Sequence, residues 1–205
     1  MNIKFRPLLC VLLALAIPTA VFAEASAIRK SEALKSAVIL VIRHAEKPAS
    51  GLGLSADGET RAKAYVNYFK QFTIDGQPLK LDCIFAAADS KGSQRSRLTL
   101  EPTSRALGLA IDTRFKDKDF QKLADEIQAK PHGTGILIAW HHGEIPALLR
   151  ALGADAGQVI PNPKWPDEVF GWVIELRYDA EGSLMDVKRI NEHLLPDDAD
   201  PSAGK

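Results

Sequence analysis

Cysteine is nearly absent from this sequence. Its 205 residues include only Cys10 and Cys83, and Cys10 lies in an N-terminal segment that we expect to be removed. With only one cysteine left, the chain cannot form an internal disulfide, and it cannot build a metal site from cysteine ligands. Cys83 lies in the apolar run LDCIFAA and is expected to be a small buried side chain. The fold must therefore be held together by its hydrophobic core.

The sequence also lacks an excess of charge of either sign. Lys and Arg number 26, and Asp and Glu also number 26, so no overall basic field favours nucleic acid or an acidic membrane surface. The chain shows no internal repeat and no linker between domains. We therefore predict no nucleic-acid partner, and any anion site must be local.

The N-terminus has the pattern of an export signal. Lys4 and Arg6 precede an apolar run over residues 8–17, and the small-residue pattern Val21-Phe22-Ala23 follows. The run is shorter than the ~20 residues that a membrane-spanning helix needs, and its end is typical of a cleavage site. We predict a signal peptide over 1–23 that is cleaved after Ala23, a periplasmic or secreted location, and no stable membrane anchor.

The rest of the chain has the length of one domain of ordinary size. We predict a single domain over 24–193 and a flexible tail over 194–205, because the tail sequence LLPDDADPSAGK is rich in proline, aspartate and small residues. The sequence does not indicate an oligomeric state.

Short apolar runs alternate with amphipathic segments along this domain. Strands are expected at 37–43, 79–87, 110–115 and 135–140, with a hairpin over 168–193 that turns at Glu181-Gly182-Ser183. Helices are expected at 55–72, 93–109, 120–128 and 144–153, with a break or restart at Pro102. This alternation predicts a three-layer α/β/α sandwich with a mostly parallel central sheet. Ligands of such folds bind beyond the carboxyl ends of the strands.

The first expected strand ends in Arg43 and His44. A neutral imidazole is a nucleophile near pH 7, and a guanidinium binds oxyanions through a fixed fork of donors. Together they suit attack on phosphorus, with Arg43 holding the phosphoryl oxygens. A surface arginine beside a core histidine would give the same dipeptide, so this pair alone does not decide the function.

The second strand is followed by SKGSQRSRLTLEP, residues 90–102. Arg95 and Thr99 are four residues apart and share a helix face. Arg95 lies near the helix start, where the partial positive charge of the helix end adds to its own. Arg95 would complete an anion clamp, to which Lys91 and Arg97 could contribute. A solvated basic helix face is the alternative.

The third strand is followed directly by His141 and His142. One of them could hydrogen-bond the transferring phosphoryl group or orient His44. A metal site is the alternative, but neighbouring residues point in different directions, and no further ligands cluster around them in the sequence. We predict no metal and no cofactor.

Taken together, these segments resemble the histidine phosphatase superfamily, whose fold is called phosphoglycerate mutase-like. Arg43-His44 resembles the signature arginine and phosphorylated histidine, and Leu54-Ser55-x-x-Gly58-x-x-Arg61 resembles the motif that follows them. Arg95-x-x-x-Thr99-x-Glu101-Pro102 resembles the block that carries the second pocket arginine. The blocks occur in the family's order over nearly the whole chain after residue 23.

The resemblance implies a metal-independent phosphatase that hydrolyses phosphomonoesters or phosphoramidates through a phosphohistidine on His44. Arg43 and Arg95 would clamp the phosphoryl group of a small phosphorylated substrate or inorganic phosphate, and His141 or His142 would assist. The commoner family spacing before Ile145-Pro146 favours His141. Related spacings favour His142, to which we give a slight preference.

The resemblance leaves the general acid and the exact activity open. Glu144, Asp117 and Asp119 are candidates for the acid, and none matches the family pattern cleanly. A phosphate-binding pseudoenzyme without turnover and a structural envelope protein with vestigial motifs are alternatives. Mutase-type phosphoryl transfer is disfavoured, because the segment 96–140 leaves little room for insertions that enclose a substrate. The aromatic segment WPDEVFGW, residues 165–172, suits either a rim over the site or packing within the hairpin.

Overall fold

The computed structural model describes residue 1 and residues 30–161, 164–196 and 198. Apart from Met1, the expected signal peptide over 1–23 lies outside the described residues, as do residues 197 and 199–205 of the expected tail. No helix among the described residues is long and apolar enough to cross a membrane.

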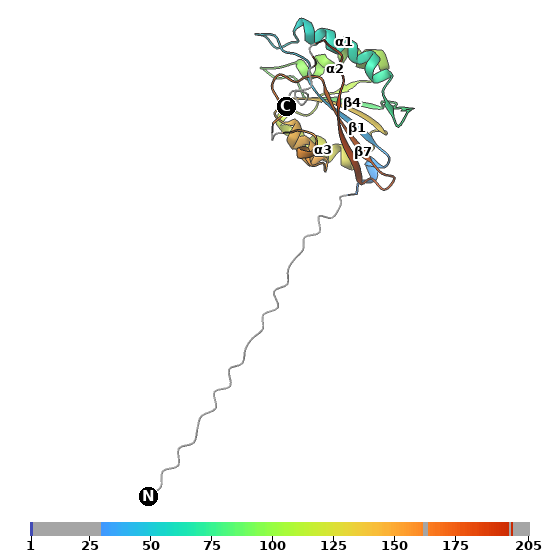
Figure 1. Ribbon diagram of the computed structural model, residues 1–205, viewed down its shortest axis with the longest axis vertical. Helices are drawn as coiled ribbons and strands as arrows, with labels where there is room; N and C mark the ends of the chain where they lie inside the picture. The colour runs from blue at the N-terminus through green and yellow to red at the C-terminus, as the bar shows by residue number, and fades with distance from the viewer. Residues whose placement is uncertain (2–29, 162–163, 197, 199–205) are drawn as a thin grey trace.

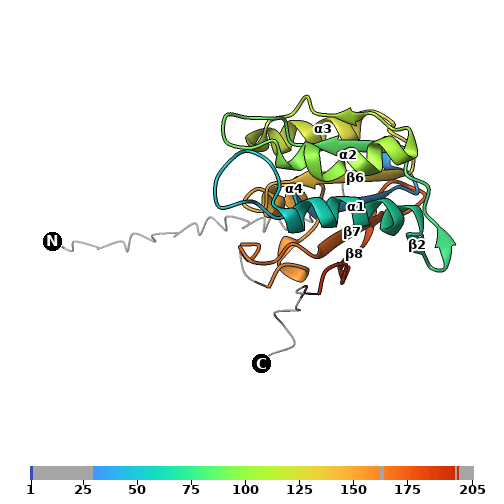
Figure 2. The ribbon, with the colours of Figure 1, turned by 90° about the horizontal axis from the view of Figure 1, so that it is seen from above.

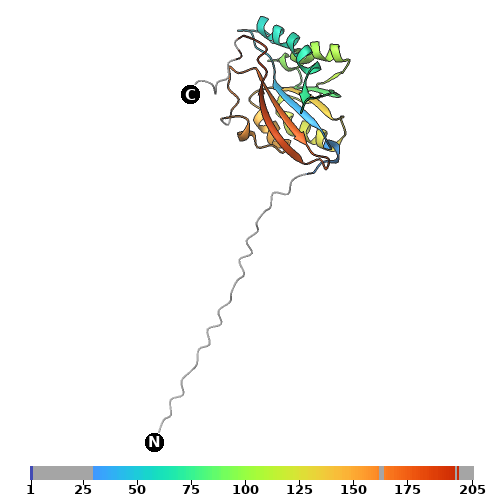
Figure 3. The same ribbon diagram turned by 45° about the vertical axis from the view of Figure 1, so that its right-hand side comes forward.

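A six-stranded sheet lies at the centre of the described structure, in the order β5-β4-β6-β1-β7-β8. The neighbouring strands β5, β4, β6 and β1 are parallel, whereas β7 runs antiparallel to both β1 and β8. The expected mostly parallel sheet and the terminal hairpin are therefore confirmed, and Figure 3 shows the hairpin beside β1. The strands are β1 (Val38–Arg43), β4 (Cys83–Ala86), β5 (Ile111–Asp112), β6 (Gly135–Trp140), β7 (Trp172–Tyr178) and β8 (Leu184–Asn191).

Helices cover both faces of this sheet, which gives the expected three layers (Figure 1). One face packs against α1 and α2 through a cluster that includes Tyr65, Phe69 and Leu100. The other packs against α3 and α4 through a cluster that includes Leu123 and Leu148. The helices are α1 (Ala56–Lys70), α2 (Arg95–Leu107), α3 (Phe120–Ala129) and α4 (Ile145–Ala151), with short 3-10 turns at Glu32–Leu34, Asp117–Asp119 and Ala156–Gln158.

The two central strands are apolar because both of their faces are covered. All six residues of β1 and all six residues of β6 are buried. Burying an apolar side chain of this size contributes about 1.5–3 kcal/mol, so the continuous runs VILVI and GILIAW contribute strongly to the stability of the sheet. The chain therefore places the ends of these two strands side by side, with Arg43 opposite Trp140 in register.

The expected helix break at Pro102 is wrong. The helix α2 runs without interruption from Arg95 to Leu107, with Pro102 inside it. Proline removes one hydrogen bond and crowds the preceding turn, but Thr99, Leu100 and Thr103 of the same helix are fully buried. Packing of this face against the sheet holds the helix together where local propensity alone would end it.

Three further details differ from the sequence-based picture. A small hairpin of β2 (Thr73–Ile74) and β3 (Gln77–Pro78), which was not expected, follows α1 and projects from the sandwich (Figure 2). Cys83 is half-buried rather than enclosed. Within the expected tail, Leu194 packs against the core beneath α1, and Asp198 bonds to an α1 side chain described below.

Candidate active site

Three strand ends bring the candidate residues together at one edge of the sheet. The backbone N–H of His44 donates to the carbonyl of Trp140 at 3.0 Å, and that of Ala87 donates to Ala139 at 3.1 Å. These bonds continue the parallel ladder one residue beyond β1 and β4. His44, His141 and the segment leading to Arg95 therefore start from neighbouring points, as the rule for ligand sites in such sheets predicts.

His44 is buried, and its ring is held in one tautomer. Its Nδ1 lies 2.8 Å from the carbonyl oxygen of Ala45. A carbonyl only accepts, so Nδ1 carries the proton and Nε2 keeps its lone pair. Burial, with smaller contributions from His141, Arg43 and Arg95, lowers the pKa of His44 to about 3. The imidazole is therefore neutral near pH 7, which is the form that can act as a nucleophile.

The structure brings His141, not His142, against His44. The two ring centroids of His44 and His141 are 5.0 Å apart in an edge-on arrangement. Burial lowers the pKa of His141 to about 4. His142 points elsewhere, with its Nε2 2.8 Å from the carboxylate of Asp167. The slight preference for His142 is thus not supported by the geometry, because adjacent residues after a strand project to different sides.

Arg43 is committed largely to a loop rather than to open space. Its Nη1 donates to the carbonyls of Pro166, Asp167 and Val169 at 3.2, 2.7 and 2.9 Å. Its guanidinium carbon lies 3.8 Å from the centre of the Phe170 ring, a cation–π contact. Burial lowers the pKa of Arg43 to about 10, so it remains charged near pH 7. The segment 165–172 therefore forms part of this site, and Arg43 fixes it there.

Arg95 lies in the first turn of α2 and contributes positive charge to the histidine pair. It lowers the pKa of both His44 and His141, and its buried Nε has no hydrogen-bond partner among the described residues. Thr99 explains the spacing of the motif. Its hydroxyl donates to the Arg95 carbonyl and accepts the N–H of Ala45, both at 2.8 Å, which ties the start of α2 to the residue after His44.

Arg97 and Lys91 are not part of this arrangement. Arg97 pairs with Asp89 at 2.9 Å and with Glu101 at 3.8 Å, so its charge is matched by carboxylates on the surface. Lys91 is exposed in the turn before α2. Of the two arginines, it is the charge of Arg95 that acts on His44 and His141.

The three candidate acids differ sharply in their surroundings. Burial, followed by the nearby charge of Glu144, raises the pKa of Asp117 to about 6, although Lys118 opposes this shift. One Asp117 carboxylate oxygen is buried without a partner among the described residues. Glu144 forms an ion pair with Lys118, and Asp119 accepts bonds from Lys122 and the Lys116 backbone. Asp117 is therefore the one of the three best suited to hold a proton near neutral pH.

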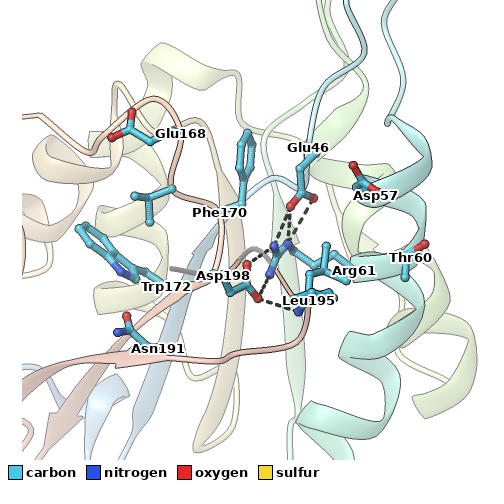
Figure 4. Close-up of a pocket in the computed structure, with 13 residues that line it drawn as sticks. Glu46, Asp57, Thr60, Arg61, Glu168, Phe170, Trp172, Asn191, Leu195 and Asp198 are labelled. Atoms are coloured by element: carbon cyan, nitrogen blue, oxygen red, sulfur yellow. Dashed lines mark hydrogen bonds and ion pairs between the residues drawn. The ribbon is translucent and has the colours of Figure 1, made fainter. Parts of the chain in front are cut away.

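The sequence did not assign a role to Arg61, although it recognised its motif. Arg61 is buried in α1 and bonds to the carboxylates of Glu46, Glu192 and Asp198. A cavity of about 320 Å³ beside this cluster is lined by residues that include Asp57, Phe170 and Trp172, but not by His44 or His141 (Figure 4). Arg61 precedes the apolar Tyr65 by four residues and so lies on the same, buried face of the helix. An arginine on a buried face needs a charged partner, and this spacing was the signal in the sequence.

No group of three or more His, Cys, Asp or Glu side chains among the described residues is arranged to hold a metal ion. The candidate site itself offers two histidines that are neutral near pH 7, two arginines and a carboxyl group with a raised pKa. An electropositive centre with a free imidazole nitrogen is suited to binding an anion and attacking it.

Comparison with known proteins gives only distant similarities. No known family profile and no curated protein matches the sequence. Similar solved structures include a putative phosphohistidine phosphatase SixA from Agrobacterium tumefaciens, with 16% identity, a TM-score of 0.48, and 74% of this chain and 97% of that chain covered. A phosphoglycerate mutase from Plasmodium falciparum has 18% identity and a TM-score of 0.46, with 80% and 97% of the two chains covered. A phosphoglycerate mutase from Bacillus anthracis has 12% identity and a TM-score of 0.42, with 75% of this chain and 92% of that chain covered. At such distances function has to be inferred from the side chains of the site.

Proposed function

We propose that this chain is a metal-independent phosphatase of the histidine phosphatase superfamily, which hydrolyses phosphomonoesters or phosphoramidates through a phosphohistidine on His44. The observation that carries the proposal is the tautomer of His44. Its Nδ1–H donates to the Ala45 carbonyl, so Nε2 is unprotonated beside His141 and within the field of Arg95. A neutral imidazole next to fixed positive charge is what in-line attack on a phosphoryl group requires.

In the first step, the Nε2 lone pair attacks phosphorus, the N–P bond forms, and the bond to the leaving oxygen or nitrogen breaks. The leaving group takes the proton of Asp117. The positive charge that develops on the His44 ring is stabilised by the Ala45 carbonyl at Nδ1. In the second step, water attacks phosphorus, the N–P bond breaks, and the proton of the water returns to the Asp117 carboxylate. Phosphate leaves, and His44 is neutral again.

Arg95, His141 and the donors of Arg43 that the loop does not use would hold the phosphoryl oxygens. Arg43 would have a second role, since its Nη1 holds the segment 166–170 in place. His142, through Asp167, would fasten the same segment. The roles thus divide into attack by His44, clamping by Arg43, Arg95 and His141, and support of the loop by Arg43 and His142.

Release of phosphate from p-nitrophenyl phosphate, with EDTA present, tests the proposal directly. Wild type should turn over, and His44→Ala should lose at least about a thousandfold in rate, because the side chain that attacks phosphorus is removed. Arg95→Ala should lose about 2–4 kcal/mol of transition-state stabilisation, whereas Arg97→Ala, a matched surface arginine, should behave as wild type. Turnover that survives in His44→Ala would contradict the mechanism. Binding of phosphate or vanadate without turnover in wild type would point instead to the pseudoenzyme.

We also propose that the protein acts outside the cytoplasm after removal of residues 1–23. The charge, length and small-residue ending of that segment support this location. Expression of the full chain in a bacterial host, cell fractionation and N-terminal sequencing should place the protein in the periplasm or medium, beginning at Glu24. An intact N-terminus in the cytoplasmic fraction would be inconsistent with this assignment.

A further inference from the structure

The guanidinium of Arg61 joins three carboxylates that are far apart in the sequence. Glu46 follows β1, Glu192 follows β8, and Asp198 lies near the C-terminus. The Arg61 side chain is 2% exposed, and the partner side chains are 16%, 0% and 8% exposed. A buried ion cluster of this kind is not an efficient source of stability, because desolvation offsets most of the attraction. Its geometry therefore calls for another explanation.

The donors of Arg61 are divided between two sides. Its Nε lies 2.9 and 3.2 Å from the two Glu46 oxygens, and its Nη2 lies 2.6 Å from one of them. On the other side, Nη1 lies 3.0 Å from Asp198 Oδ2, and Nη2 bonds to Asp198 Oδ1. Figure 4 shows Arg61 between Glu46 and Asp198. Arg61 thus bonds to Glu46 and to Asp198 at once, and its Nη1 also bonds to Glu192.

Asp198 is itself well fixed. Its Oδ2 accepts the backbone N–H groups of Leu194 and Leu195, both at 2.8 Å. These bonds and the ion pair lower the pKa of Asp198, although burial opposes them. A carboxylate held by two backbone donors is a rigid anchor for a guanidinium.

Glu46 shares a peptide plane with the carbonyl that holds His44. The Ala45 carbonyl, which accepts the Nδ1–H of His44 at 2.8 Å, is bonded directly to the Glu46 nitrogen. A peptide unit is planar, so a rotation at Glu46 would turn this carbonyl away from the ring. On the α1 side, Ser55 N–H donates to the Glu46 carbonyl at 2.9 Å, and a Cβ on Gly58 would lie 2.5 Å from that oxygen. Glu46, the second residue of the Ala45–Glu46 peptide, is therefore held against the start of α1 through its own carbonyl and through its side chain.

We propose that Asp198 is a positioning residue for His44: through Arg61 and Glu46 it holds the Ala45 carbonyl on Nδ1, and so keeps Nε2 free for attack. Asp198, which is held by the backbone of Leu194 and Leu195, would then help to orient the proposed nucleophile His44. The rate effect of this arrangement rests on the proposed phosphatase function, but its effect on the His44 tautomer does not.

The test compares Asp198→Ala with Asp75→Ala. Asp75 lies in the turn of the small β2–β3 hairpin and forms a 2.6 Å ion pair with Arg177 of β7, so its loss removes an ion pair that does not involve Arg61 or Glu46. The tautomer is measured by two-bond ¹H–¹⁵N correlation on the His44 ring, assigned by comparison with His44→Gln. Asp198→Ala should give a mixture of Nδ1–H and Nε2–H forms, and Asp75→Ala should give the wild-type Nδ1–H form.

With p-nitrophenyl phosphate, Asp198→Ala should lower kcat about tenfold and leave KM nearly unchanged, because only the orientation of the attacking atom is lost. Glu46→Gln, which keeps the shape of the side chain, should have a similar effect. The double variant should be no worse than the poorer single variant, since both act through one chain of contacts.

The outcomes separate the two proposals. If Asp198→Ala and Glu46→Gln both keep the wild-type tautomer and kcat, the positioning role is overturned. If wild type shows no turnover but Asp198→Ala still changes the tautomer, the phosphatase proposal fails and the positioning role stands. Should Asp198→Ala not fold, as judged by circular dichroism, Glu46→Gln decides by the same two measurements.

Discussion

At the scale of single residues, the site depends on which nitrogen and which oxygen carry a proton. Burial lowers the pKa of His44 to about 3 and of His141 to about 4, and raises that of Asp117 to about 6. Between about pH 4 and pH 6 the two histidines are therefore neutral while Asp117 holds a proton, as the proposed mechanism requires. Separation of the pKa values of neighbouring groups by their surroundings is the usual basis of acid–base chemistry in a single site.

His141 should matter far more than His142 for the chemical step. We expect His141→Ala to lower kcat at least about a hundredfold, because a hydrogen-bond donor next to the reacting phosphoryl group is lost. We expect His142→Ala to change kcat less than about tenfold, since His142 contacts the loop through Asp167. Steady-state kinetics of the two matched alanine variants with p-nitrophenyl phosphate measures this difference. A larger effect of His142→Ala would reverse the assignment.

If Asp117 is the general acid, its titration should appear in the pH dependence of kcat for a substrate with a poor leaving group. With an alkyl phosphate, kcat should fall as the pH rises above about 6, because the acid loses its proton there. Asp117→Asn should abolish that fall and lower the rate on the acidic side. With p-nitrophenyl phosphate, whose leaving group needs little protonation, Asp117→Asn should stay close to wild type. Equal losses with both substrates would argue against a role as acid.

At the scale of elements, close packing between a loop and a helix controls the site. The turn after β1 lies against the start of α1, where Gly58 allows the Glu46 backbone to approach. Ser55 caps this helix by accepting the N–H of Gly58 at 3.1 Å. The motif Leu-Ser-x-x-Gly-x-x-Arg thus has a physical meaning: a helix cap, a close approach and a buried arginine, at the end of α1 that lies against Glu46, two residues after His44.

Two glycine variants should separate stability from activity. In Gly58→Ala the new Cβ would lie 2.5 Å from the Glu46 oxygen, and in Gly182→Ala it would lie 1.9 Å from the Ser31 oxygen, at a φ of 78°. Each variant should lose about 1–3 kcal/mol of unfolding free energy, as measured by urea denaturation. Only Gly58→Ala should also lower kcat in the folded protein, because Gly182 turns the hairpin away from His44. Equal kcat values would show that the Glu46 backbone does not position the site.

At the scale of the whole molecule, the buried titratable groups make stability depend on pH. His44 and His141 have folded pKa values of about 3 and 4, below the ordinary value of about 6.5. The unfolded chain therefore binds more protons than the folded protein between about pH 4 and 6.5, and their contribution to stability falls on acidification. Glu192 works in the opposite direction. Burial raises its pKa to about 7, so its contribution to stability falls as the pH rises from about 4.5 to 7.

The temperature of unfolding at pH 6.5 and 4.5, measured in phosphate-free buffer, tests this balance. His141→Asn should reduce the loss of Tm on acidification, because one neutral buried imidazole is removed. Glu192→Gln should increase that loss, because the group that favours the acid side is gone. The exposed residue His193 provides a control, and His193→Asn should leave the difference unchanged. A Glu192→Gln variant with a smaller loss than wild type would contradict the assigned direction.

Much of the fold followed from patterns that act locally. The runs VILVI and GILIAW are typical of strands that are buried on both faces of a sheet, and Ser55 begins a helix by capping it. The helix break predicted at Pro102 was wrong. The sequence shows that proline lacks an N–H, but it does not show the packing of Thr99 and Leu100 that keeps α2 continuous. The hairpin of β2 and β3 was missed because each of its strands has only two residues, too few for a period to be read.

The candidate site was predictable where the residues adjoin strand ends. Arg43, His44 and Arg95 could be singled out because a parallel sheet places its carboxyl ends together. Other features depend on side-chain directions and on loops that are distant in sequence. They are the choice of the histidine that faces His44, the carboxyl that is enclosed, and the acceptors to which Arg43 donates. Those are tertiary properties, since the segment 165–172 contacts Arg43 through the pairing of β7 with β1.

The sequence by itself determined the alternation of elements, the order of the motifs and the kinds of side chain available for phosphoryl chemistry. Only the tertiary structure decided the tautomer of His44, the pairing with His141 and the link from Asp198 through Arg61 to Glu46. The physical reason is that periodicity and caps act over a few residues along the chain. Burial, which sets protonation, and hydrogen bonds between distant segments exist only once the sheet and helices have packed.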